Sequence, residues 1–243
     1  MALRLNAELL PLLPREAGKN WVFDGYVDPI TREVAWSRFW TGQFDFTGVT
    51  WDNPRTLTMI TPRHVVMAKH YVRPAGSAVI FHDKRGQEVQ RVLMGFVKLP
   101  GKWDVAVGIL NEAMPVGVKH YKLLEPSEKL HTDMLGTLAL VTDGKRKVHV
   151  HECGSMPPEM ISFRFPRSLP EGFYAPLVKG DSGNPSFVMV RGEPVLIETH
   201  FLGGAGVGPF YGSALIQAEI RAAIVELAVQ FGGADYSFQT VRP

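Results

Sequence analysis

The sequence has very little cysteine, a small net charge and no long apolar run. Its single cysteine, Cys153, cannot form a disulfide within the chain. The formal net charge is only +2, so composition gives no reason to expect a nucleic-acid partner or an anionic membrane surface. No segment approaches the about 20 consecutive apolar residues of a membrane span, and we expect no membrane partner.

The first residues also lack the pattern of an export signal. Residues 1–15 contain apolar side chains, but Asn6, Glu8 and Pro11 interrupt them before a continuous apolar core forms. We therefore expect a cytoplasmic or virion-associated protein.

Glycine and proline, in contrast, are plentiful, with 24 and 18 residues, which is typical of turn-rich β proteins. Short β-rich runs alternate with turn residues, and Asp143-Gly144 is a strong hairpin signal. The predicted strands are 39–46, 56–61, 77–82, 88–94, 104–110, 135–142, 147–152, 186–190 and 194–201. Apolar residues at helical spacing predict a helix over 217–231, packed on the second half of the chain.

The segment Gly180-Asp181-Ser182-Gly183 carries the clearest chemical signal. Glycines allow backbone conformations in which consecutive N–H groups point at one place, and such a group of donors can hold an oxyanion. A serine hydroxyl beside these donors is suited to acyl transfer, provided that a base activates it. The sequence therefore predicts Ser182 as a nucleophile, with the amides of Gly180 and Ser182 as an oxyanion hole.

Two earlier segments offer a base and a group to orient it. They read Met67-Ala-Lys-His-Tyr71 and Asp104-Val-Ala-Val107, and they precede Gly180-Asp-Ser-Gly-Asn-Pro185. Together, over roughly residues 35–230, the chain resembles the chymotrypsin-like serine proteases. Their corresponding patterns are Thr-Ala-Ala-His-Cys, Asp-Ile-Ala-Leu and Gly-Asp-Ser-Gly-Gly-Pro, in the same His, Asp, Ser order. Because Tyr71 stands where secreted animal members have a cysteine, the chain is closer to small disulfide-free bacterial and viral members.

The resemblance implies a role for each member of the triad. Ser182 would attack a peptide carbonyl, His70 would move the proton, and Asp104 would orient the imidazole. His64 lies six residues before His70 and competes with it on sequence alone. We favour His70, because it follows the small Ala68 as the family pattern requires.

The resemblance also implies an all-β fold of two six-stranded antiparallel β-barrels with a C-terminal α-helix. The expected parts are an N-terminal extension over 1–35, a first barrel over 36–112 and a linker over 113–133, then a second barrel over 134–216, the helix over 217–231 and a tail over 232–243. The aromatic residues of the extension are expected to wrap the barrels or to contact a partner.

Substrate preference is expected to depend on residues around the serine. Pro176 stands six residues before Ser182, where the trypsin subgroup has an aspartate, so a preference for Arg or Lys is not expected. The strand ending His200-Phe201-Leu-Gly203 resembles that of glutamyl endopeptidases and picornavirus main proteases, in which a histidine binds a Glu or Gln side chain. His200 would recognise such a side chain, the segment from Phe201 to Gly203 would bind substrate backbone, and Lys179 would attract an acidic group.

Two further features of the sequence concern metal binding and activation. His149, His151 and Cys153 alternate along one predicted strand and could hold Zn²⁺, but no fourth ligand is evident, so we expect no metal or other cofactor.

Asp181 would pair with a new amino terminus in family members activated by cleavage. Here no Ile-Val-Gly-Gly precedes His70, and Asp181 is expected to pair with an internal donor or cation, or to cap its own loop.

The sequence therefore predicts a serine endopeptidase that acts on polypeptides through an acyl-enzyme, with a preference for Glu or Gln before the scissile bond. The alternative is a catalytically latent pseudo-protease that uses the same fold to bind peptides. A serine esterase would share the chemistry.

Overall fold

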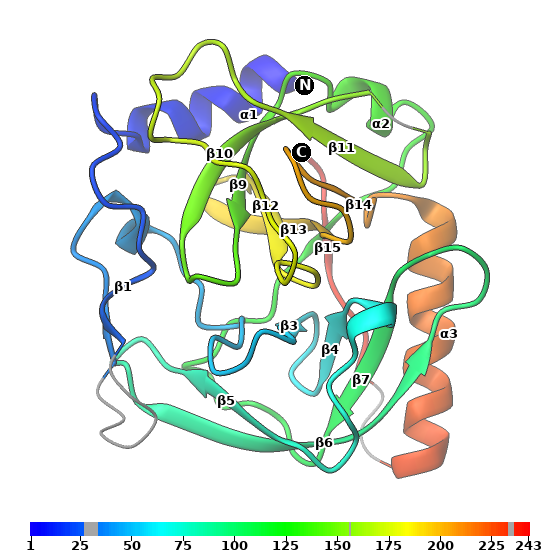
Figure 1. Cartoon of the computed structure of the whole chain (residues 1–243). Helices are drawn as coiled ribbons and strands as arrows, with labels where there is room; N and C mark the ends of the chain where they lie inside the picture. The colour runs from blue at the N-terminus through cyan, green and yellow to red at the C-terminus, as the bar shows by residue number, and fades with distance from the viewer. Residues whose placement is uncertain (27–33, 156, 233–235) are drawn as a thin grey trace.

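The computed structural model describes residues 1–26, 34–155, 157–232 and 236–243. The chain is mostly β and forms two curled sheets with a C-terminal helix (Figure 1). The N-terminal sheet has the strand order β3-β4-β7-β6-β5, and the C-terminal sheet has the order β14-β11-β10-β9-β12-β13-β8-β15. Because these sheets hold five and eight of the described strands, the six-stranded barrels stay a prediction.

The N-terminal sheet comprises β3 (Thr58–Met59), β4 (His64–Met67), β5 (Ala78–His82), β6 (Glu88–Lys98) and β7 (Ala106–Leu110). Every residue of β4 and β7 is buried, as expected of short apolar strands in the middle of a sheet. The β5–β6 turn is closed by Asp83, whose Oδ1 accepts the N–H groups of Arg85 and Gln87. The predicted strands over 77–82, 88–94 and 104–110 are thus confirmed, with β6 four residues longer than expected.

The C-terminal sheet comprises β8 (Leu123–Leu124), β9 (Leu138–Thr142), β10 (Val148–Cys153), β11 (Met160–Arg164), β12 (Pro185–Val190), β13 (Glu193–Thr199), β14 (Val207–Pro209) and β15 (Thr240–Val241). The Asp143-Gly144 hairpin is confirmed between β9 and β10. Asp143 Oδ1 accepts the N–H groups of Lys145 and Lys147, at 2.9 Å each. The short strand β8 and the helix α2 (Leu130–Asp133) lie within the expected linker.

The N-terminal segment lies across the C-terminal sheet before it reaches the hairpin tip. The helix α1 (Ala2–Leu9), continued by a 3-10 turn (Leu10–Leu12), packs on β12 and β9. Its Asn6 donates to the carbonyl of Gly136 and accepts the N–H of Leu138. Further on, β1 (Phe23–Tyr26) pairs with β2 (Val34–Trp36), and Trp21 forms a β-bridge to Lys147. The expected extension is therefore built onto the fold over its described residues.

The predicted strand over 39–46 is wrong, because Trp40–Gln43 form a 3-10 helix. The backbone of Gly42 approaches Ser37 so closely that an added Cβ would lie 1.8 Å from the Ser37 carbonyl oxygen. The Thr41 hydroxyl donates to the carbonyl of Trp21. These contacts with Ser37 and with Trp21 hold the chain in the compact helical turn.

The C-terminal helix α3 (Ala214–Phe231) begins three residues earlier than predicted, and its position was predicted wrongly. Its body packs against β6 and β7 of the N-terminal sheet (Figure 1). Its start is tied to the second half of the chain, where Gln217 Nε2 donates to the carbonyls of Leu124 and Tyr211. Gly95 of β6 makes room for the helix, since an added Cβ there would lie 2.4 Å from the Phe231 ring. The apolar face of the helix belongs to the same buried cluster as Val107 and Ile109.

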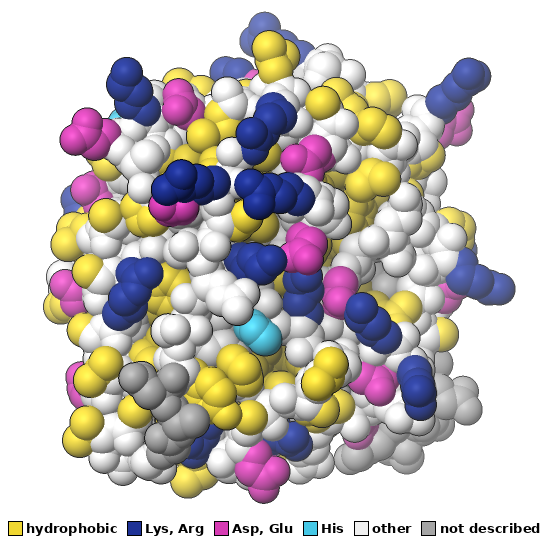
Figure 2. Space-filling model, turned by 180° about the vertical axis from the view of Figure 1, so that it is seen from behind, with side chains coloured by type: hydrophobic (Ala, Val, Ile, Leu, Met, Phe, Trp, Pro, Cys, Tyr) yellow, Lys and Arg dark blue, Asp and Glu magenta, His cyan; other side chains and the backbone are white. Residues whose placement is uncertain are grey.

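The surface carries charges of both signs. Lys and Arg side chains are interspersed with Asp and Glu on the face seen from behind (Figure 2). Among the described residues, we find no helix with the length and apolar character needed to cross a bilayer.

Candidate active site

His70 and Asp104 are brought together by two neighbouring strands of the N-terminal sheet. The strands β4 and β7 pair with Met67 opposite Ala106, so the chain leaving β4 passes the residues that enter β7. The 3-10 turn Lys69–Tyr71 follows β4 and exposes His70 to solvent. Asp104 lies just before β7, with a side chain that is largely buried.

Both carboxylate oxygens of Asp104 contact His70. Its Oδ2 lies 2.6 Å from His70 Nδ1, and its Oδ1 accepts the His70 backbone N–H at 2.8 Å. Since an ionised carboxylate is only an acceptor, this contact places the ring proton on Nδ1 and leaves Nε2 as the basic nitrogen. The His70 ring is half-exposed, and Nε2 is its nitrogen on the side away from Asp104.

His64 occupies a different environment. It is buried, its Nδ1 contacts the hydroxyl of Thr61 at 2.9 Å, and burial together with the charge of Arg63 lowers its pKa to about 4. Asp104 therefore pairs with His70, as expected, and not with His64.

The loop that carries Ser182 precedes β12 of the C-terminal sheet, so the candidate site combines residues of both sheets. Gly180 and Gly183 have φ values of +105° and +90°, which L side chains rarely adopt. Gly183 N–H donates to the carbonyl of His200 at 2.8 Å. An added Cβ on Gly183 would lie 3.5 Å from the backbone nitrogen of Ala68, which places this loop beside the turn that bears His70.

Asp181 fixes the shape of the loop. Its Oδ2 accepts the N–H of Val178 at 2.6 Å, and its Oδ1 accepts the N–H of Gly144 in the β9–β10 turn at 3.0 Å. The side chain is buried, so these two hydrogen bonds are largely shielded from water. Asp181 thus caps its own loop and ties it to an internal donor, as the sequence led us to expect.

The amides of Gly180 and Ser182 are free to serve as donors. Within the described part of the chain, neither N–H group donates a hydrogen bond to another residue. Unpaired backbone donors in a turn of this kind form a concave site for negative charge. They are the two amides that the sequence predicts as the oxyanion hole.

The predicted residues meet at one cavity of about 350 Å³. Its walls include His70, Lys179, Gly180, Ser182, His200, Phe201 and Gly203, all predicted from sequence, together with Asp181. Pro176 is exposed and does not line it. Leu202, inside the segment predicted to bind substrate backbone, also lines the cavity. Val178 lines it too and was missed, although it is an exposed apolar residue next to Lys179. The cavity therefore has apolar walls beside its polar groups.

No hydrogen bond joins the Ser182 hydroxyl to the His70 ring in the described structure. Such bonds are often long in unliganded enzymes and tighten when substrate binds. Ser182 and His70 line the same cavity, so they are neighbours in the site without a hydrogen bond between them.

His200 lines the cavity, but chain groups already contact both of its ring nitrogens. Nε2 lies 3.1 Å from the Thr142 carbonyl, and Nδ1 lies 2.6 Å from Oε1 of Glu198. Burial by itself would lower the pKa of His200, but the Glu198 carboxylate and the Thr142 carbonyl raise it above its usual value. Glu198 fits because Gly208 lacks a Cβ, which would lie 1.8 Å from Glu198 Oε2.

The strand with His149, His151 and Cys153 holds no metal-binding cluster. His149 Nε2 contacts Asp143, and the two ring nitrogens of His151 face the carbonyls of Ala205 and Ala175. Burial lowers the pKa of His151 to about 4 and raises that of the Cys153 thiol. Across the described residues, no group of three potential ligands could hold a metal ion.

Comparisons with protein-family models and with curated proteins find no match to this chain. The functional argument therefore depends on the site itself.

Proposed function

We propose that the protein is a serine endopeptidase with Ser182 as nucleophile, His70 as general base and acid, and Asp104 as the residue that orients His70. The observation that carries the proposal is the His70–Asp104 contact of 2.6 Å beside a cavity that Ser182 also lines. The Asp104 carboxylate leaves His70 Nε2 unprotonated and stabilises the imidazolium that forms during reaction.

The reaction runs through an acyl-enzyme. His70 Nε2 accepts the Ser182 proton as the oxygen attacks the substrate carbonyl, and the amides of Gly180 and Ser182 hold the oxyanion. His70 then donates that proton to the leaving amine. A water molecule, deprotonated by His70, attacks the ester, and the returned proton restores the Ser182 hydroxyl.

The arrangement of the two sheets supports a chymotrypsin-like protease. The base and its partner come from loops of the N-terminal sheet, and the nucleophile comes from a loop of the C-terminal sheet. We propose that the sheets represent the two six-stranded barrels of that family.

Two features of the cavity bear on the proposed preference for Glu or Gln. Lys179 is exposed at the cavity and supplies a positive charge for an acidic side chain. His200 would have to exchange its Thr142 or Glu198 contact for one with the substrate. In peptide libraries we expect faster cleavage after Glu or Gln; preferred cleavage after Arg or Leu would contradict this part of the proposal.

Labelling with a fluorophosphonate probe tests the main proposal. We expect one adduct on Ser182, lost in Ser182→Ala and strongly slowed in His70→Ala. The matched variants Ser127→Ala and His131→Ala, which lie outside the cavity, should label as the wild type does.

A folded wild-type protein that forms no adduct would favour the second candidate, a latent peptide-binding protein of the same fold. The observation that favours this candidate is the missing hydrogen bond between Ser182 and His70 in the described structure. Peptide binding without turnover would then be the expected result.

A further inference from the structure

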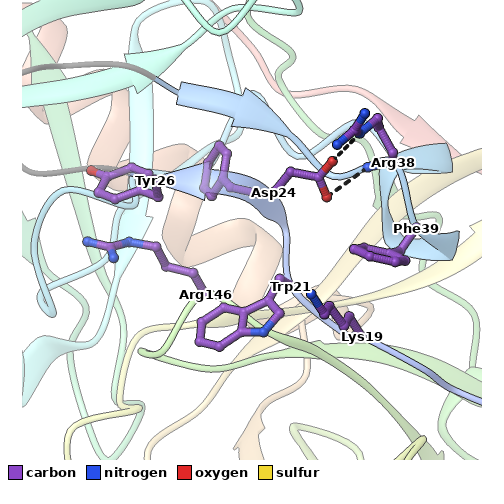
Figure 3. Close-up of a pocket in the computed structure, with 8 residues that line it drawn as sticks. Lys19, Trp21, Asp24, Tyr26, Arg38, Phe39 and Arg146 are labelled. Atoms are coloured by element: carbon purple, nitrogen blue, oxygen red, sulfur yellow. Dashed lines mark hydrogen bonds and ion pairs between the residues drawn. The ribbon is translucent and has the colours of Figure 1, made fainter.

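A larger hollow, of about 850 Å³, lies away from the candidate active site. Three segments surround it: residues 19–26, residues 38–39 and Arg146 of the β9–β10 turn (Figure 3). Its volume is within the range of about 300–1,000 Å³ that is usual for ligand sites. None of its lining residues belongs to the proposed triad or to the cavity beside it.

Aromatic rings are exposed in this hollow. Trp21 and Phe39 are 42% and 41% exposed, and Tyr26 is half-buried nearby. Exposed large rings that gather at a concave surface are typical of binding sites, because water solvates them poorly. The rings can therefore serve as flat contact surfaces for a ligand.

Each ring is accompanied by a cation. The Arg146 guanidinium lies 3.5 Å from the centre of the Tyr26 ring, Lys147 Nζ lies 4.9 Å from Trp21, and Lys19 Nζ lies 5.4 Å from Phe39. Such cation–π contacts hold positive charge beside the rings.

The charge of the hollow is positive. Asp24 is its only acidic lining residue among those described, and Arg38 pairs with it at 2.6 Å (Figure 3). The hydrogen bond from Arg38 lowers the pKa of Asp24, which therefore stays ionised. The negative charge of Asp24 offsets the positive charge of Arg38. Lys19 and Arg146 of the lining, together with Lys147 beside Trp21, therefore leave an excess of positive charge, even though the whole chain has a net charge of only +2.

The backbone holds these side chains in place. Val22 N–H donates to the Arg146 carbonyl at 2.9 Å, which joins the first segment to the hairpin turn. Arg146 Nε donates to the Trp51 carbonyl at 3.0 Å, and the Thr41 hydroxyl binds the Trp21 carbonyl. A site whose parts are fixed before binding loses less conformational freedom when a ligand arrives.

We propose that this hollow binds single-stranded nucleic acid. Flat rings stack on unpaired bases and nearby cations bind the phosphates, and the combination is typical of proteins that bind single strands. An acidic peptide would use the cations but would leave the rings without a partner. A duplex would offer phosphates but would keep its bases stacked inside the helix. From the small net charge of the whole chain we expected no nucleic-acid partner. That net charge is a sum over the whole surface and does not reveal a local excess of positive charge.

Fluorescence anisotropy of a labelled 12-nucleotide single strand, DNA and RNA in parallel, tests the proposal with the full-length protein. We expect Trp21→Leu and Phe39→Leu each to weaken binding about 5- to 150-fold, the effect of one lost stacking contact. Phe165→Leu, which removes an exposed ring elsewhere, should leave binding unchanged.

The salt dependence of binding tests the cations. Lys147→Gln is expected to lower the slope of log affinity against log salt concentration by about 0.7, the value for one phosphate contact on a single strand. Lys129→Gln, an exposed lysine far from the hollow in sequence, serves as the matched control. Melting temperatures of all variants establish that they fold.

Competition identifies the ligand class. We expect the unlabelled single strand to displace the probe, and a mononucleotide to do so weakly if several nucleotides are bound. Equal or stronger competition by a duplex or by polyglutamate would overturn the proposal. So would the absence of binding at low salt, or binding that the Trp21 and Phe39 variants leave unchanged.

Discussion

Asp104 is the residue on which the proposed chemistry depends most directly after Ser182 and His70. It binds both the ring and the backbone of His70, so it fixes the position of the imidazole as well as its proton. An amide at this position could still bind the backbone N–H, but it would present a donor to one ring nitrogen and favour the wrong tautomer.

We therefore expect Asp104→Asn to lower kcat by about 10⁴-fold, while the protein stays folded. Steady-state kinetics with a peptide substrate measure this change. Asp133→Asn, which makes the same substitution at an exposed position, should keep the wild-type kcat. Nearly equal rates for both variants would show that Asp104 does not orient the base.

The buried pair of Glu198 and His200 makes stability depend on pH. Because the folded-state pKa of His200 is raised, folding favours its protonated form. The resulting stabilisation is fully present below the unfolded value of about 6.5, and it is lost as the pH rises through the folded-state pKa. Urea unfolding at a series of pH values should show this loss above pH 6.5. Glu198→Gln should reduce the pH dependence, and an unchanged profile would contradict the assignment.

Among single residues, sequence reasoning found most of the candidate site. His70, Asp104 and Ser182 stand in short motifs whose spacing is readable in a linear sequence. Glu198 is two residues before His200, but its buried place was not readable, because Gly208 of another strand makes room for it. The Thr142 partner was not readable either, because Thr142 lies on a separate strand. Contacts of this kind depend on how strands pair, and no local pattern encodes that pairing.

Among the helices and strands, α3 was likewise predicted only in part. Its apolar spacing predicted a helix, but helical periodicity says which residues are buried and not which sheet covers them. The docking on β6 depends on Gly95, whose missing side chain admits Phe231. The 3-10 turn at Trp40–Gln43 was missed for a related reason, since alternating apolar residues are compatible with a tight turn when a neighbouring segment binds it.

The packing of α3 gives a direct test. Leu227 is fully buried against the N-terminal sheet, whereas Val229, two residues later, is 83% exposed. We expect Leu227→Ala to lower the free energy of unfolding by about 2–5 kcal/mol, since it leaves a cavity in the core. Val229→Ala should change it by less than about 0.5 kcal/mol. Similar effects of the two substitutions in chemical denaturation would show that the helix is not docked in this way.

For the whole molecule, one apolar core connects the two sheets. Val107 and Ile109 of β7 belong to the same buried cluster as Leu140 of β9 and Phe187 of β12. Neither sheet can therefore lose its inner face without exposing apolar surface of the other.

We expect the sheets to unfold together. Circular dichroism, tryptophan fluorescence and probe labelling of Ser182 should report the same midpoint in urea. Loss of labelling at a lower urea concentration than the loss of β structure would show that the site opens locally. Two separate β transitions would show that the sheets are independent.

The hydrogen bonds of Asp181 to the amides of Val178 and Gly144 have a consequence for how such an enzyme would be controlled. Both donors are internal backbone groups, so the serine loop takes its shape when the chain folds, without a newly cut chain end. If Ser182 acts as proposed, the protein is competent from the moment of folding. Restraint on its activity would then have to come from outside the loop, through the timing of synthesis, through an inhibitor, or through which polypeptides can reach the cavity.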